Sequence, residues 1–89
     1  MAKLTPALES SGWQQSADGK SIEKIFKFGN FRDAFAWMTR AAFEAEDMDH
    51  HPEWRNVYNR VEVCLTTHDT GGLTSKDLDL AARMDKLSD

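Results

Sequence analysis

The sequence predicts an α+β fold in which a four-stranded antiparallel sheet carries helices on one face. The expected order is helix, strand, strand, helix, strand, strand, helix, so α-β-β-α-β-β-α, within a single domain spanning 1–89. Apolar residues recur with a helical period in some segments and alternate with polar residues in others. The strands come in pairs joined by short turns, and such strands pair antiparallel. This arrangement is typical of an α+β sandwich.

The first helix is marked by residues that favour its two ends. In the segment 5–12, Thr5 suits the N-cap, Pro6 suits the first helical position and Gly12 suits the stop. A short helix is therefore expected before the first strand.

A hairpin is expected in the segment 12–30. Asp18-Gly19 is the favoured chemistry of a tight primed turn between two strands. After this turn, Ile22, Phe26 and Phe28 fall on one face with a period of two. These three residues are expected to face the core.

The segment 30–47 has the period of a long helix, which Asn30 can cap. Trp37 widens the apolar stripe of this helix, and Phe43 falls outside the stripe, on the side that should face water or a partner. The stripe has i, i+3, i+4, i+7 spacing and comprises Phe31, Ala34, Phe35, Met38, Ala41, Ala42 and Ala45.

Pro52 prevents the helix from continuing, and a second hairpin is expected after it. The segment 53–57 reads as one strand and 61–68 as the next, with Asn59 as the turn residue that tolerates a left-handed conformation. In the second of these strands, Val61, Val63 and Leu65 alternate with polar residues or cysteine.

The last helix begins near Thr74, which stands in near capping-box spacing to Asp77. Two glycines before it break the preceding strand. Leu78 lies outside the apolar face of this helix, which comprises Leu80, Ala81, Met84 and Leu87.

Length and charge limit the classes of protein to consider. A chain of 89 residues builds a thin core, so oligomerisation is expected to add stability. The net charge of −4 argues against direct binding of nucleic acid, which requires clustered Lys and Arg. Cys64 is the only cysteine, and the sequence shows no apolar run of about 20 residues and no signal-peptide pattern. A cytoplasmic protein without a membrane association is expected.

All three histidines lie between residues 50 and 68. His50 and His51 occupy the bend before the third strand, and His68 ends the fourth strand. Because these strands are expected to form a hairpin, the start of one lies beside the end of the other. We therefore expect the three imidazoles to gather at one edge of the sheet.

Three interpretations of this cluster compete. The first is a set of ordinary exposed loop histidines, and the second is a zinc site with three imidazole ligands. The sequence lacks the HxH, HxxxH and HExxH spacings that favour a metal. The third is acid–base catalysis without a metal, in which Glu46, Asp49 and Asp69 orient the imidazoles. We favour the third.

The segment AEDMDHHPEWRNVYNRVEVCLTTHDTGGLTSKDLDLA, residues 45–81, resembles the signature of the pterin-4a-carbinolamine dehydratase family. A glutamate stands four residues before His-His-Pro, and a tryptophan stands two residues after the proline. Asn-Val-Tyr-Asn, a valine-alternating strand, Thr-His and Gly-Leu-Thr-x-x-Asp follow in order. The likeness continues upstream through IEKIFKFGNF and so covers nearly the whole chain.

The resemblance implies a lyase that dehydrates a 4a-hydroxytetrahydropterin to the quinonoid dihydropterin and thereby supports tetrahydropterin recycling. It implies no cofactor and no metal, a small-molecule pterin as the partner, and assembly as a homodimer or homotetramer. The implied catalytic residues are His50, His51, His68 and the supporting acid Glu46. The implied pterin contacts are His50, His51, Pro52, Trp54, Thr67, His68, Asp69, Thr70 and Asp77.

Two of these residues also have a purely structural explanation. Asp77 can serve as the helix-cap partner of Thr74, and Trp54 can belong to the core. For the reaction itself, His50 and His68 are our candidates for proton transfer, and His51 for holding the pterin. The alternative function is a non-enzymatic protein-binding module of the dimerisation-cofactor type, which the family also includes.

Overall fold

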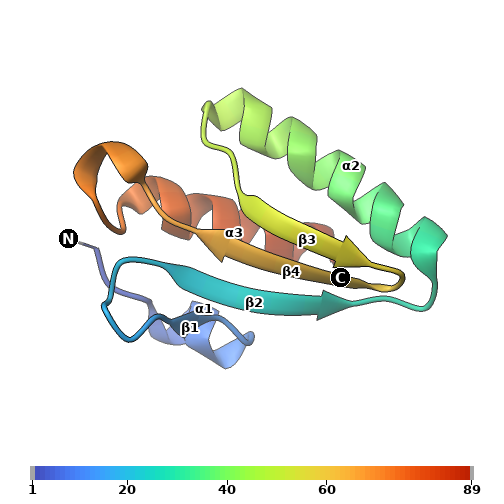
Figure 1. Cartoon of the computed structure of the whole chain (residues 1–89), viewed down its shortest axis with the longest axis horizontal. Coiled ribbons are helices and arrows are strands. Elements are labelled where there is room, and N and C mark those ends of the chain that lie inside the picture. Colours follow the sequence, from blue (N-terminus) through green and yellow to red (C-terminus); the bar gives the residue numbers. More distant parts are fainter. Residues whose placement is uncertain (1, 89) are drawn as a thin grey trace.

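The computed structural model describes residues 2–88 and has the predicted element order (Figure 1). Three α-helices and four strands are joined by short connections, and one 3₁₀ turn follows the last strand. The elements are α1 (Pro6–Ser10), β1 (Gln14–Gln15), β2 (Ile22–Lys27), α2 (Phe31–Met48), β3 (Glu53–Val57), β4 (Arg60–Leu65), η1 (His68–Thr70) and α3 (Ser75–Leu87). The predicted α+β class is confirmed.

The four strands form one antiparallel sheet in the order β1-β2-β4-β3. β2 and β4 are central, and β3 forms an edge strand beside α2 (Figure 1). The β3–β4 register pairs Glu53 with Cys64 and Val57 with Arg60. The start of β3 therefore lies beside the end of β4, as the hairpin prediction requires.

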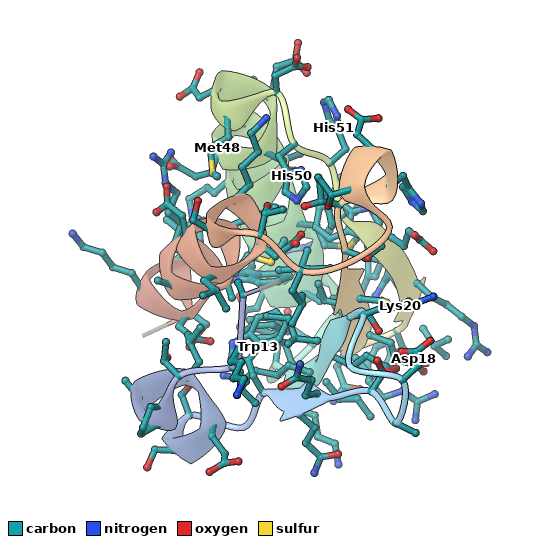
Figure 2. All side chains as sticks on the ribbon, turned by 90° about the vertical axis from the view of Figure 1, so that its left-hand side faces the viewer. Trp13, Asp18, Lys20, Met48, His50 and His51 are labelled. Carbon is teal, nitrogen blue, oxygen red and sulfur yellow. The ribbon has the colours of Figure 1, made fainter. Side chains whose placement is uncertain are left out.

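The helices cover one face of this sheet, and the other face is open (Figure 2). Side chains alternate between the two faces, so Val61, Val63 and Leu65 of β4 are buried beneath the helices. Ile22 and Phe26 of β2 lie on the same face, as predicted. Two tryptophans are the largest fully buried side chains, and the remaining fully buried residues include Leu73, Leu80 and Met84.

The helix ends follow the predicted capping residues. The Thr5 hydroxyl accepts a hydrogen bond from the Leu8 N–H at the start of α1, with Pro6 in the first helical turn. The Asn30 side chain accepts one from the Asp33 N–H at the start of α2. Among the helices described, none is long and apolar enough to cross a bilayer.

The buried side of α2 differs from the predicted stripe. Ala34, Trp37, Ala41 and Ala45 are buried, whereas Phe31 and Phe35 are 45% and 54% exposed, and Ala42 is also exposed. At 3.6 residues per turn, the buried side is rotated by about 50° from the predicted stripe. Trp37 lies at the edge of this buried side that is farther from the predicted stripe, and its indole N–H donates to the Met84 carbonyl at 3.1 Å. Phe43 is 69% exposed, as predicted.

Both hairpin turns differ in detail from their predictions. The β1–β2 connection is a longer loop in which the Gly19 N–H donates to the Ser16 carbonyl, so Asp18-Gly19 does not form a two-residue turn. In the β3–β4 turn, Tyr58 adopts the left-handed conformation (φ 53°), not Asn59. The Asn56 amide holds this turn by donating to the carbonyls of Tyr58 and Arg60 at 3.1 and 3.0 Å.

Candidate functional site

The three histidines lie at the end of the sheet where β3 begins and β4 ends. His50 follows α2, whose C-cap residue Asp49 has a left-handed conformation (φ 50°) that turns the chain toward β3. The His50 N–H donates to the Ala45 carbonyl at 3.0 Å and fixes this bend. Figure 2 shows His50 and His51 projecting beside the 3₁₀ turn that contains His68.

His50 is paired with a buried carboxylate. Its Nε2 lies 2.5 Å from Oδ1 of Asp77, and the His50 and Asp77 side chains are only 10% and 0% exposed. A buried charge is stable only when it is paired and hydrogen-bonded. Asp77 therefore needs its partners, and in return it holds the His50 ring in one orientation.

The second oxygen of Asp77 belongs to the cap of α3. Oδ2 accepts from the Thr67 hydroxyl at 2.8 Å and from the Thr74 N–H at 3.0 Å. The Thr74 hydroxyl accepts from the backbone in return, so the predicted capping box is present. The helix-cap explanation of Asp77 is thus confirmed, and the same carboxylate also contacts His50, whereas its contact with a pterin stays a prediction.

The other two histidines form exposed pairs with glutamates. His51 Nε2 lies 2.8 Å from Glu46 Oε1, which places the predicted supporting acid in contact with a histidine. His68 Nε2 lies 2.9 Å from Glu53 Oε2. Exposed ion pairs of this kind contribute about 0–1 kcal/mol to stability, so these contacts bear on orientation more than on folding.

The loop that carries His68 is closed on itself. Thr67 and Gly72 form an isolated β-bridge, and the Thr70 hydroxyl donates to the carbonyls of Thr67 and Gly72 at 3.2 and 3.1 Å. Gly71 supplies the left-handed residue of this turn (φ 69°). Asp69 is exposed at the tip of the loop. A predicted contact segment is thereby held at a fixed distance from the start of α3.

Two further predicted contact residues, Pro52 and Trp54, flank Glu53 at the start of β3. The ring of Trp54 packs against Trp37, with centroids 6.3 Å apart, on the helix-covered face of the sheet. Within residues 2–88 it makes no hydrogen bond to a histidine. Pro52 is half-buried between the histidine pair and β3.

Neither the role of Glu53 nor the direct contact of Asp77 with His50 is predicted by the sequence. Glu53 could have been found from the hairpin register, because the first residue of β3 must lie near the residues that follow β4. The pairing of Asp77 with His50 joins residues 27 positions apart, one on α3 and the other in the bend after α2, and no spacing rule predicts it.

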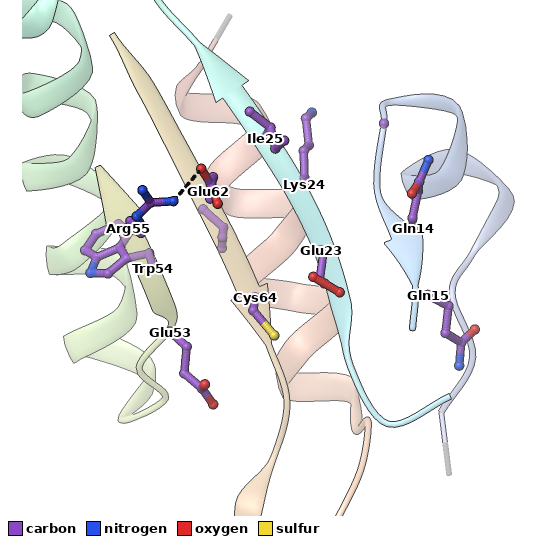
Figure 3. Close-up of a pocket in the computed structure, with 12 residues that line it drawn as sticks. Gln14, Gln15, Glu23, Lys24, Ile25, Glu53, Trp54, Arg55, Glu62 and Cys64 are labelled. Carbon is purple, nitrogen blue, oxygen red and sulfur yellow. Dashed lines mark hydrogen bonds and ion pairs between the residues drawn. The ribbon is translucent and has the colours of Figure 1, made fainter. Parts of the chain in front are cut away.

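A cavity of about 680 Å³ lies on the open face of the sheet (Figure 3). Its lining includes Glu23, Ile25, Glu62 and Cys64, and it reaches the histidine cluster only at Glu53. Burial raises the pKa of the Cys64 thiol, so this cysteine is a poor nucleophile at neutral pH. In the part of the chain that the structure describes, no group of three His, Cys, Asp or Glu side chains is arranged to hold a metal ion.

The sequence model described as pterin 4 alpha carbinolamine dehydratase matches residues 1–87. A provisionally named pterin-4-alpha-carbinolamine dehydratase of Jannaschia sp. (strain CCS1) is 53% identical over 98% of this chain and 89% of its own length. A provisionally named relative from Rhizobium johnstonii is 58% identical over 96% of this chain and 81% of its own length.

Two solved structures share the fold. A transcriptional coactivator/pterin dehydratase from Brucella melitensis has a TM-score of 0.87 at 39% identity, over 99% of this chain and 100% of its own. A pterin dehydratase-like protein described as a RuBisCO assembly factor of the alpha-carboxysome has a TM-score of 0.75, over 86% of this chain and 89% of its own. The latter is 22% identical and supports the fold alone.

Proposed function

We propose that this chain, which belongs to the pterin 4 alpha carbinolamine dehydratase family, removes water from a 4a-hydroxytetrahydropterin and releases the quinonoid dihydropterin. Family membership and the names of the relatives support dehydratase activity. The role of the histidines and the place of the reaction in tetrahydropterin recycling are our inference, as is a cytoplasmic location.

The reaction requires two proton transfers. Hydroxide is a poor leaving group, so a general acid must protonate the oxygen on C4a as the C–O bond breaks. A ring nitrogen donates its electron pair to C4a and forms a C=N double bond as the C–O bond breaks. A general base removes the proton from a ring nitrogen. Water leaves, and the substrate is neither oxidised nor reduced. Two imidazoles can perform both transfers near neutral pH, each contributing about 10²–10⁴-fold.

The observation that carries this proposal is the gathering of three histidine–carboxylate pairs at one end of the sheet. His50 is held by a buried partner, and we assign proton transfer to it and to His68. His51, whose side chain is 59% exposed, is assigned to binding the flat heterocycle, with Glu46 orienting its ring.

The direct test is a turnover assay on the purified protein. The 4a-hydroxytetrahydropterin is generated immediately before mixing, and its dehydration is followed by absorbance against the spontaneous rate. We expect the protein to accelerate dehydration catalytically. A rate equal to the spontaneous rate, in a protein that is folded by circular dichroism, would reject the enzymatic function.

A protein-binding role is the second candidate, and the exposed aromatics of α2 favour it. Phe31, Phe35 and Phe43 are between 45% and 69% exposed, and the rings of the first two pack on each other at 5.6 Å. Monomeric proteins rarely expose clustered apolar side chains without a partner. We propose that a second copy of this chain covers part of this helix in a homodimer or homotetramer. Self-association of a folded protein that shows no turnover in the assay above would favour a purely non-enzymatic module.

A further inference from the structure

Among residues 2–88, Glu53 is the one carboxylate that belongs both to the histidine cluster and to the open face of the sheet. Its Oε2 lies 2.9 Å from Nε2 of His68, and its side chain lines the open-face cavity. Figure 3 shows it leaving the start of β3 on the same face as Cys64, its partner in the β3–β4 register. Backbone pairing therefore fixes the point from which Glu53 reaches His68.

The alternation of side chains along β3 determines the face of the sheet from which Glu53 projects. The next residue, Trp54, is half-buried against the core under the helices, so Glu53 must project from the opposite face. Its partner is held as firmly, because His68 begins the 3₁₀ turn that the bridge between Thr67 and Gly72 closes. Two hydrogen-bonded backbone segments thus bring the carboxylate and the imidazole together.

The direction of this hydrogen bond determines the tautomer of His68. An ionised carboxylate only accepts hydrogen bonds, so Nε2 must carry the proton. In the neutral ring Nδ1 is then the basic nitrogen, and it makes no hydrogen bond to any other residue between 2 and 88. Each of the other two histidines also contacts its carboxylate through Nε2.

We propose that Glu53 is a positioning residue, which holds His68 in the tautomer protonated on Nε2 and presents Nδ1 to the substrate. In this arrangement Nδ1 of His68 is the atom that exchanges a proton with the pterin. The assignment of Nδ1 to the reaction rests on the proposed dehydratase function, whereas the control of the tautomer by Glu53 does not.

The test is Glu53→Gln, with Glu23→Gln as a matched control. A glutamine can accept or donate at the same place, so the tautomer preference of His68 should weaken. Glu23 lies on β2, on the same face and lining the same cavity, and it contacts no histidine in the described part of the chain. Its substitution removes the same charge without touching an imidazole.

The first measurement is a long-range ¹H–¹⁵N correlation spectrum of protein with ¹⁵N-labelled histidine rings, at a pH where the imidazoles are neutral. His68→Ala assigns the signals. We expect Glu53→Gln to move His68 from the Nε2-protonated tautomer toward a mixture, while the signals of His50 and His51 stay in place. Unchanged His68 signals, or an equal change in Glu23→Gln, would overturn the proposal.

The second measurement is turnover in single and double variants. Glu53→Gln should lower kcat about two- to fivefold, the range expected for an exposed pair. It should have no further effect in a His68→Ala background, because the imidazole it orients is absent. An equal loss in both backgrounds would overturn the assignment. A shifted tautomer in a protein without dehydratase activity would instead retain the role of Glu53 and reject the proposed reaction.

Discussion

At the scale of the residue, Asp77 joins the stability of the fold to the chemistry of the site. One of its oxygens caps α3 through Thr74 and receives the Thr67 hydroxyl, and the other receives His50. A single carboxylate thereby fixes the ring of a proposed catalytic residue to the first turn of a helix. Such a residue is expected to affect stability and activity together.

Asp77→Asn tests this double role. The Thr74 N–H can only donate, so the amide oxygen should turn toward it and the NH₂ group toward His50. His50 would then accept at Nε2 and carry its proton on Nδ1, the wrong tautomer for the reaction. We expect kcat to fall about 10²-fold or more and the free energy of unfolding to fall by about 1–3 kcal/mol. Full activity in a folded variant would contradict this role.

The histidines should separate by kinetic effect. His50→Ala and His68→Ala should each lower kcat by about 10²–10⁴-fold, because a proton-transfer group is lost. His51→Ala should mainly raise KM, because it removes a contact made equally in the ground state and the transition state. Steady-state kinetics on the three variants measure kcat and KM separately and so test this assignment of roles. Equal losses of kcat in all three would refute this division of roles.

At the scale of the element, the alternation of β4 and the helix caps followed the sequence, whereas the end of β4 and the face of α2 did not. β4 ends at Leu65, and His68 begins the 3₁₀ turn η1, not the predicted last residue of the strand. Alternation in β4 and the capping residues Thr5, Asn30 and Thr74 depend on neighbours in the chain. The orientation of α2 depends on partners far away in the sequence. The Trp37 ring packs on Phe26 with centroids 4.4 Å apart, and its indole N–H donates a hydrogen bond to Met84 of α3. Periodicity alone does not tell which of two adjacent apolar sides of a helix is buried.

The β3–β4 turn stores backbone strain that a substitution can release. Tyr58 has φ 53°, a conformation that costs an ordinary residue about 1–2 kcal/mol, and asparagine tolerates it better. Tyr58→Asn should therefore raise the free energy of unfolding by up to about 1 kcal/mol in urea titrations at fixed protein concentration. Tyr58→Phe, which keeps the strain, should change it by less than about 0.5 kcal/mol. A destabilised Tyr58→Asn variant would contradict the strain.

At the scale of the whole molecule, the hairpin register explains why the histidine cluster could be foreseen. Antiparallel pairing of β3 with β4 brings His51 and His68 to one end of the sheet, although they are 17 positions apart in the sequence. The carboxylates that contact the histidines could be predicted only in part. Glu46 lies near in sequence, whereas the contacts of Asp77 and Glu53 depend on how α3 and the η1 loop pack.

The exposed aromatics of α2 form the surface that we propose for self-association. Leu78, which lies outside the predicted apolar face of α3, is half-buried against the core, so Leu78→Glu would disturb the fold as well as any assembly. Phe35→Glu is the cleaner test together with Phe43→Glu, because both side chains are exposed on α2. Sedimentation should show weaker assembly, with Ala82→Glu, at an exposed position of α3, as the control. A monomeric unmodified protein at micromolar concentration would refute assembly.

Acid–base catalysis by the histidines is tested by comparing the unmodified protein with a His50→Ala/His68→Ala double variant, both treated exhaustively with a chelator. We expect the unmodified protein to accelerate dehydration of freshly generated 4a-hydroxytetrahydropterin and the folded double variant to leave it near the spontaneous rate. An active double variant, or activity lost on chelation and restored by zinc, would contradict acid–base catalysis by these histidines.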